Sequence, residues 1–344
     1  MIKFFVPMGV TEMIIEVSLR KWESVSYFLY DPLKRLRMGG YSYSKDLKIF
    51  VRETDLRKVN FGTWRLEVVS RETGETPLFD LKVEFSRSKV RPQWYRGELH
   101  THTKASDGKW SIEELTLVLK ERGVDFFFVT DHNVLGTSKP IEVKGLQVYP
   151  GIEITVAKGH TVVLDPDEKL RPFKFDGYIC GIAHPFFPRN ESCPDCSFES
   201  SWKCDFVEVW NSDIENERWF IYNVEALKKY KRVVKRRYLT AVATGDVHNE
   251  ASLVHWIPSH FLLPDLSLES VLNSLVEGLV VCGEVKIDED RLVLPEAARA
   301  FLEGTELSTN TLENFHETRE LEVKRPDGKL LVYYNFKAPL NQYL

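Results

Sequence analysis

The chain has 344 residues, of which 43% are hydrophobic and 28% are charged, and its formal net charge is −5. These fractions are ordinary for a soluble globular protein with a sizeable core. The negative charge argues against a dedicated nucleic-acid binder, because such proteins usually carry an excess of basic residues.

The chain's start has one basic residue and an apolar run interrupted by Pro7, which is too short for a signal peptide. No apolar run approaches the roughly 20 residues that a membrane span needs, so we expect a cytoplasmic protein. Five cysteines, an odd number, do not suggest a secreted disulfide framework. Glutamine is scarce beside Lys, Arg and Glu, a bias that is seen in heat-adapted proteins.

Residues 1–90 are predicted to form a small β-sandwich domain. Apolar and polar residues alternate in 79–85 and in 64–68, and residues 25–30 and 47–51 are shorter strand candidates. Turn-forming Asp-Pro, Gly-Gly and Asn-Phe-Gly stretches separate these candidates, which is typical of a sandwich. A polar linker over residues 86–92 is expected to end this domain.

Residues 94–283 change to predicted strands that alternate with helices. Ser111 and Glu114 have the capping-box spacing and predict a helix that ends at Gly123. The apolar run at 124–130 fits a strand that is covered on both faces. Further strands are predicted at 146–150, 161–164, 177–183, 206–209, 238–244, 259–263 and 279–282, with helices at 216–237 and 267–277.

Residues 284–344 are expected to form an extension that packs on the rest of the chain. It is predicted to contain a helix at 295–302 and a hairpin across residues 325–329.

Side chains that bind metal ions recur at or beside the ends of the predicted strands. His100 and His102 project to the same side, because strand side chains alternate between faces. Asp107 follows next to Gly108, which permits a tight turn. The candidate ligands are His100, His102, Asp107, His132, Glu153, His160, His184, Asp246 and His248. Core packing does not explain such a cluster, since each unpaired buried group would cost several kcal/mol, and imidazoles with a few carboxylates suit Zn, Mn or Fe.

The order HxH, SDG, TDH, GxE, GH, HP and GDxH in residues 94–283 resembles the polymerase and histidinol phosphatase (PHP) superfamily. Within that superfamily, residues 151–155, 159–164 and 207–211 are similar to the carbaryl-hydrolase-like (CehA/McbA) branch. The resemblance implies an α/β protein with a distorted (β/α)7 barrel, preceded by the β-sandwich, and a centre of two or three divalent metal ions.

Carried over by motif, the resemblance implies three groups of ligands. The first ion would be bound by His100, His102, Glu153 and Asp246, and Glu153 would bridge to a second ion on His160 and His184. Asp107, His132 and His248 would bind a third ion. Many family members have His in place of Asp107.

Two adjacent metal ions can share a hydroxide and clamp the attacking and leaving oxygens, so the expected reaction is hydrolysis. The leading interpretation is a phosphoesterase acting on a small phosphate ester or a nucleotide. The alternative is hydrolysis of a carbamate, ester or amide, as the carbaryl-hydrolase resemblance suggests. The ligands alone do not separate the two.

Three further residues are candidates for roles in catalysis. Arg189 is the first candidate for a phosphate contact, because a guanidinium binds phosphate bidentately. Lys104 is the second, because it lies between two ligands, and a solvated position is the alternative for both. Asp131 either orients a ligand histidine or is a cap or turn residue.

The cysteines support three interpretations. Cys193 and Cys196 have the C-x2-C spacing of a structural zinc site, but a second such pair is missing and Cys180 would have to join Cys204 as the remaining ligands. A disulfide and unmodified thiols are the alternatives.

Overall fold

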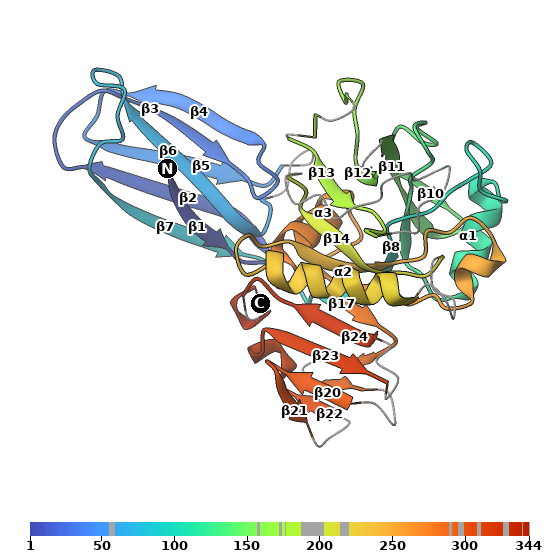
Figure 1. Ribbon diagram of the computed structural model, residues 1–344. Helices are drawn as coiled ribbons and strands as arrows, with labels where there is room; N and C mark the ends of the chain where they lie inside the picture. The colour runs from blue at the N-terminus through green and yellow to red at the C-terminus, as the bar shows by residue number, and fades with distance from the viewer. Residues whose placement is uncertain are drawn as a thin grey trace. The chain divides into compact units, whose positions relative to one another are not determined.

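The structure is a computed structural model that describes residues 1–54, 59–156, 159–171, 174–175, 177–186, 203–213, 220–288, 291–294, 299–307, 311–325, 330–338 and 340–343. The chain divides into two compact units, residues 1–92 with the C-terminal segment from Asn341, and residues 93–340 (Figure 1). In the described ranges, no helix combines the length and the apolar character needed to cross a membrane.

The first unit contains two antiparallel sheets that share one core. Their orders are β1-β6-β3-β4 and β5-β2-β7. Alternate residues of β2 and β6 are buried, which brings Met13, Ile15 and Val17 into the same cluster as Trp64 and Leu66. The strands are β1 (Ile2–Val6), β2 (Val10–Leu19), β3 (Val25–Tyr30), β4 (Leu36–Ser42), β5 (Asp46–Arg52), β6 (Gly62–Ser70) and β7 (Phe79–Arg87). The four strands predicted in this region are confirmed as β3, β5, β6 and β7, whereas the residue patterns do not predict β1, β2 or β4.

The described part of the second unit contains one 14-stranded sheet and one three-stranded sheet. The large sheet consists of β8 (Gln93–Glu98), β9 (Phe126–Val129), β10 (Ile141–Val143), β11 (Leu146–Val156), β12 (Gly159–Leu164), β13 (Ile179–Ile182), β14 (Phe206–Asn211), β15 (Thr240–Thr244), β16 (Ser259–Leu263), β17 (Val280–Gly283), β20 (Arg299–Leu302), β21 (Thr305–Leu307), β23 (Glu320–Lys324) and β24 (Leu330–Asn335). The small sheet consists of β18 (Lys286–Asp288), β19 (Arg291–Val293) and β22 (Thr311–Glu313).

The large sheet mixes parallel and antiparallel pairs in the order β15-β14-β13-β12-β11-β9-β8-β16-β17-β24-β23-β20-β21, and β10 pairs with β11. Strands β8, β9 and β11 run parallel, as do β13, β14 and β15, and the antiparallel strand β12 joins these two groups. The end strand β15 lies against β16, because the Ala243 N–H donates to Ser259 Oγ at 2.9 Å. The sheet therefore curls, which brings the ends of its central strands together.

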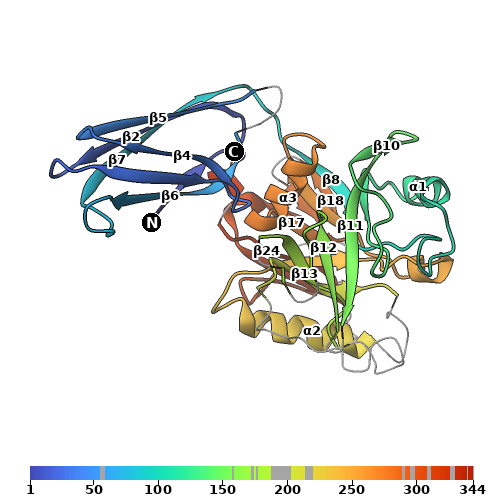
Figure 2. The same ribbon diagram turned by 90° about the horizontal axis from the view of Figure 1, so that it is seen from above.

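The described residues contain three α-helices, α1 (Ile112–Glu121), α2 (Phe220–Val233) and α3 (Leu268–Glu277), and 3-10 turns at Glu250–Leu253, Phe315–Glu317 and Leu340–Gln342. The capping box predicted at the start of α1 is confirmed, since Ser111 Oγ accepts from the Glu114 N–H and the Glu114 carboxylate accepts from the Ser111 N–H. Helix α2 packs against β14, and α3 packs against β15 and β16 (Figure 2).

The predictions for two helices need correction. The helix predicted at 295–302 is wrong over its second half, where β20 pairs antiparallel with β23 from Arg299 to Leu302, and residues 295–298 lie outside the described residues. Here the hydrogen-bonded pairing of β20 with β23 overrides the helix propensity of the alanines in this stretch. Helix α2 ends at Val233 rather than at residue 237. The hairpin prediction is confirmed by the antiparallel pair β23 and β24, although the turn at 326–329 is outside the described residues.

Candidate metal centre

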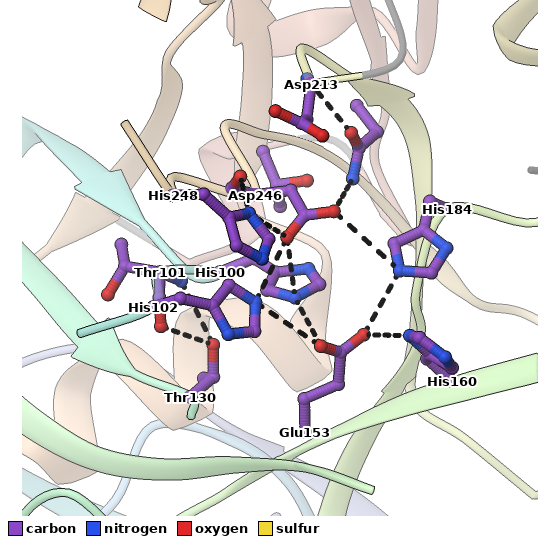
Figure 3. A network of polar contacts seen from close by, with 12 residues as sticks. His100, Thr101, His102, Thr130, Glu153, His160, His184, Asp213, Asp246 and His248 are labelled. Atoms are coloured by element: carbon purple, nitrogen blue, oxygen red, sulfur yellow. Dashed lines mark hydrogen bonds and ion pairs between the residues drawn. The ribbon is translucent and has the colours of Figure 1, made fainter. Parts of the chain in front are cut away.

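The ends of the central strands bring the predicted ligands into one cluster (Figure 3). His100 and His102 follow β8, and isolated bridges join Thr101 to Val247 and His132 to Glu153. In the close view, the carboxylates of Glu153 and Asp246 face each other, with His100, His102 and His248 on one side and His160 and His184 on the other. The curled sheet therefore assembles residues that are more than 140 positions apart in the sequence.

Four buried donor atoms, called the tetrad below, converge at the centre of this cluster: His100 Nε2, His102 Nε2, Glu153 Oε2 and Asp246 Oδ1. His100 Nε2 lies 3.1 Å from Glu153 Oε2 and 3.2 Å from Asp246 Oδ1. His102 Nε2 lies 3.3 Å from Glu153 Oε2 and 3.1 Å from Asp246 Oδ1. None of the four atoms makes a hydrogen bond within the described residues. Ligands held about 2.0 Å from a tetrahedral ion lie about 3.3 Å from one another, so this arrangement fits a divalent metal ion.

The two oxygens of Glu153 face different histidines. Glu153 Oε1 lies 2.9 Å from His160 Nδ1 and 3.1 Å from His184 Nε2. Glu153 Oε2 belongs to the tetrad and also lies 3.0 Å from His132 Nδ1. A carboxylate with nitrogen donors at both oxygens has the arrangement needed to bridge two ions.

Asp107 lies at the solvent side of the cluster. Its Oδ1 is 3.4 Å from His248 Nε2, and its Oδ2 is 3.7 Å from His132 Nε2. The Asp107 side chain is 57% exposed, whereas those of His100 and His102 are fully buried. A Cβ on the neighbouring Gly108 would lie 2.2 Å from the His102 carbonyl oxygen, so glycine is required where this loop passes the ligand backbone. The cluster is thus buried at His100 and His102 and open to solvent at Asp107, which is called its open side below.

Glu208, which the sequence reasoning did not select, contacts two of the candidate ligands directly and a third through Asn211. Its Oε1 lies 2.7 Å from His100 Nδ1, and its Oε2 accepts from the His184 N–H at 2.7 Å. Asn211 Nδ2 donates to the same Oε2 at 2.9 Å and to Asp246 Oδ2 at 3.3 Å. A carboxylate at Nδ1 favours a proton on that atom, so with a cation bound the neutral imidazole of His100 would direct its Nε2 lone pair towards the space between Glu153 and Asp246.

A second buried carboxylate, Glu98, fixes the backbone around the tetrad. It accepts from the His100 N–H at 2.9 Å, the Gly245 N–H at 2.8 Å and Trp256 Nε1 at 2.6 Å. Burial raises the pKa of Glu98 to about 7 in spite of these hydrogen bonds. Glu208 is the one acid of the buried strand β14, and this was the available signal for it in the sequence, whereas Glu98 ends β8, a strand that also contains Gln93 and Arg96.

Two candidate ligands have unusual backbone conformations. His184 has φ of 22° and Asp246 has φ of 49°, values that non-glycine residues rarely adopt. Such conformations cost about 1–3 kcal/mol each and persist where surrounding contacts impose them. Here the contacts are the hydrogen bonds of the His184 N–H to Glu208 and of the Gly245 N–H to Glu98.

Of the other predicted site residues, the structure describes Asp131 and Lys104. Asp131 accepts hydrogen bonds from the Thr103 N–H and hydroxyl at 2.7 Å and from the Ser106 hydroxyl at 2.6 Å. It therefore holds the loop that carries Asp107, and these contacts fit the second of its two predicted roles, that of a cap or turn residue. Lys104 forms an exposed ion pair with Glu114 at 2.7 Å. Arg189, Cys193 and Cys196 lie outside the described residues.

Asp213 is a further acid that the sequence reasoning missed, although it follows the end of β14. It can share a cation with Asp246 and His248, and its Oδ1 accepts from the Ser252 hydroxyl at 2.5 Å. Burial, followed by the charge of Asp246, raises the pKa of Asp213. Its place after a strand end was the available signal.

The cluster has strongly shifted pKa values. Burial disfavours the protonated imidazole of His248, but Asp246 and Asp107 outweigh burial and raise its pKa to about 10. Burial is likewise outweighed at His100, where Asp246 and Glu153 raise the pKa well above its ordinary value. Burial would raise the pKa of Glu153, but His100 and its neighbours lower it well below its ordinary value. Without a cation, imidazolium protons therefore balance the buried carboxylates.

Metal binding is expected to compete with these protons. Because the raised histidine pKa values keep imidazoles protonated at neutral pH, a cation must displace protons, and its affinity should rise with pH. We expect about a tenfold rise per pH unit for each proton released. Titration of the metal-free protein with Mn²⁺ between pH 6 and 8 measures this dependence. An affinity that does not change with pH would contradict it.

Comparisons with known proteins give only distant likenesses. No protein-family model and no curated protein matches the sequence. A two-domain protein from Bacteroides vulgatus, described as containing a predicted PHP-like metal-dependent phosphoesterase, aligns with 74% of this chain and 91% of its own, at 12% identity and a TM-score of 0.41. An amidohydrolase from Chromobacterium violaceum, with bound sulfate and no metal, aligns with 44% of this chain and 87% of its own, at 13% identity and a TM-score of 0.31. At such values, neither likeness assigns this chain a family or an activity.

Proposed function

We propose that this protein is a multinuclear metal-dependent hydrolase of the PHP superfamily, most similar to its CehA/McbA branch, and that it acts as a phosphoesterase on a small phosphate ester or a nucleotide. The observation that carries the proposal is the set of four buried, converging donor atoms of His100, His102, Glu153 and Asp246. Buried polar atoms without hydrogen bonds are costly, and a bound cation removes that cost.

The three ligand groups would hold two or three divalent ions, with Zn, Mn or Fe suited to the nitrogen-rich donors. The tetrad forms the first group, His160 and His184 share Glu153 in the second, and Asp107, His132 and His248 form the third. Divalent ions held close together supply Lewis acidity and lower the pKa of water. Glu208 fixes the tautomer of His100, and Asp131 fixes the loop of Asp107. Substrate would approach from the exposed side at Asp107.

The proposed fold for residues 94–283 is the distorted (β/α)7 barrel of that superfamily, with residues 284–344 as an extension. The contacts between β15 and β16 support a curled sheet, and the antiparallel strands around β12 are where it would depart from regular strand–helix alternation.

Hydrolysis of a carbamate, ester or amide is the second candidate. Lys104 was a candidate for a phosphate contact, but its ammonium pairs with the Glu114 carboxylate at 2.7 Å in an exposed position. This pairing favours a substrate without a phosphate group. The selectivity for phosphate over a neutral carbonyl group would then depend on residues that line the open side, and Arg189 stays the first candidate from the sequence for a phosphate contact.

A substrate panel separates the candidates. The full chain, loaded with Mn²⁺ or Zn²⁺, is expected to hydrolyse an aryl phosphate, and a chelator is expected to abolish the reaction. Aryl carbamates and aryl esters serve as the comparison. Hydrolysis of these without hydrolysis of any phosphate ester would contradict the phosphoesterase proposal and support the second candidate.

A further inference from the structure

Two buried cysteines lie side by side on adjacent strands. Cys180 belongs to β13, and Cys204 lies two residues before β14. Both side chains are fully buried, and their Sγ atoms are 2.7 Å apart. They belong to an apolar cluster that also contains Val163 and Val207.

The backbone around this pair is held in register. The Asp205 N–H donates to the Cys180 carbonyl at 2.7 Å, and the Cys180 N–H donates to the Asp205 carboxylate at 3.4 Å. Strands β13 and β14 continue from there as a parallel pair. This register places Cys180 opposite Asp205, so Cys204 is displaced by one residue along the strands. A strand spacing of about 4.8 Å and a rise of about 3.3 Å per residue give a Cα separation of roughly 6 Å, which is within the range of about 4.4–6.8 Å that a disulfide spans.

We propose that Cys180 and Cys204 form a structural disulfide that cross-links β13 and β14. It would form by exchange with a small-molecule disulfide before the two strands close. One cysteine thiolate attacks that disulfide and expels one thiolate, and the second cysteine thiolate then attacks the mixed disulfide and expels the other. The protein loses two protons and two electrons, and the small disulfide is reduced to two thiols.

The cross-link lies on the strand pair that carries part of the metal cluster. His184 follows Cys180 by four residues, and Glu208 follows Cys204 by four residues. The hydrogen bond from the His184 N–H to Glu208 joins the two strands at the cluster, and the disulfide joins them at the opposite end. The proposal concerns the covalent state of the chain and does not depend on its hydrolytic activity.

Peptide mapping of the full chain tests the proposal. Protein purified without reductant is denatured, its thiols are alkylated, and it is digested with and without a phosphine reductant. We expect a peptide pair joined through Cys180 and Cys204 that disappears on reduction. Alkylation of both cysteines without reduction would overturn the proposal, and so would a cross-link from either one to another cysteine.

Thermal unfolding gives a second readout. A disulfide that closes the loop from Cys180 to Cys204 is expected to raise Tm, so reduction should lower the Tm of the native chain by roughly 5–10 °C. The Cys180→Ser/Cys204→Ser variant should show the lower Tm and no response to reductant. Cys282→Ser, at another buried thiol, is the matched control and should keep the response. Two results together would overturn the disulfide in favour of a zinc site with thiolate ligands. The Cys180→Ser/Cys204→Ser variant would lack a zinc ion that the native protein binds, and both thiols of the native protein would be alkylated after chelation.

Discussion

Replacing Glu153 with glutamine is expected to lower the hydrolysis rate by about 10³-fold or more and to remove bound metal. A Lewis-acid centre contributes several kcal/mol to a transition state, and each 1.36 kcal/mol corresponds to about tenfold in rate. Glu153 is chosen because its two oxygens lie within 3.3 Å of nitrogens from five histidines. Glutamine removes the negative charge and replaces one carboxylate oxygen with an NH2 group. Its N–H bonds would then point at the histidines that surround either Oε1 or Oε2.

The measurement combines metal content with the rate on the best substrate of the panel. Glu142→Gln, the same substitution at an exposed position of β10, is the matched control and should leave both values unchanged. Excess metal should not restore Glu153→Gln, because the ligand itself is altered. A variant that keeps its metal content and its rate would refute the role assigned to Glu153.

Glu208→Gln is expected to weaken metal affinity or activity by about 10–100-fold, the usual effect of removing the partner of a ligand histidine. Glutamine can still accept from the His184 N–H, but its other terminal group is then a donor that faces His100 Nδ1. The proton of His100 would move to Nε2, which is the atom directed at Glu153 and Asp246.

Saturation with metal distinguishes this effect from the loss of a ligand. Glu208→Gln should regain most of its activity at high metal concentration, whereas Glu153→Gln should not. Glu225→Gln on the exposed side of α2, where Glu225 pairs with Lys228, is the control. If Glu208→Gln has the metal affinity of the native chain, Glu208 does not position His100.

Most of the candidate ligands could be selected from the sequence because an apolar run stops at or just before them, whereas His160 precedes its run and Asp107 follows His102 by five residues. His100 and His102 are spaced two apart, and in the structure both Nε2 atoms face the same two oxygens. The capping box of α1 could be predicted for a similar reason, since it depends only on residues that are three positions apart.

The sequence reasoning missed features that depend on contacts between distant segments. Glu208 lies within an apolar strand, and its role appears only when β14 is placed beside His100 and His184. The left-handed backbone of Asp246 leaves no pattern in the residues around it. Strand β20 has residues that favour a helix, and only its pairing with β23 makes it a strand. In each case a tertiary contact, rather than a local preference, decides the structure.

Anomalous diffraction from crystals of the full chain grown with Mn²⁺ or Zn²⁺ tests the central claim most directly. We predict one anomalous peak among His100 Nε2, His102 Nε2, Glu153 Oε2 and Asp246 Oδ1. A second peak is predicted beside Glu153 Oε1, His160 and His184. Fully loaded crystals without a peak in contact with Glu153 would contradict the claim that these residues form a multinuclear metal centre.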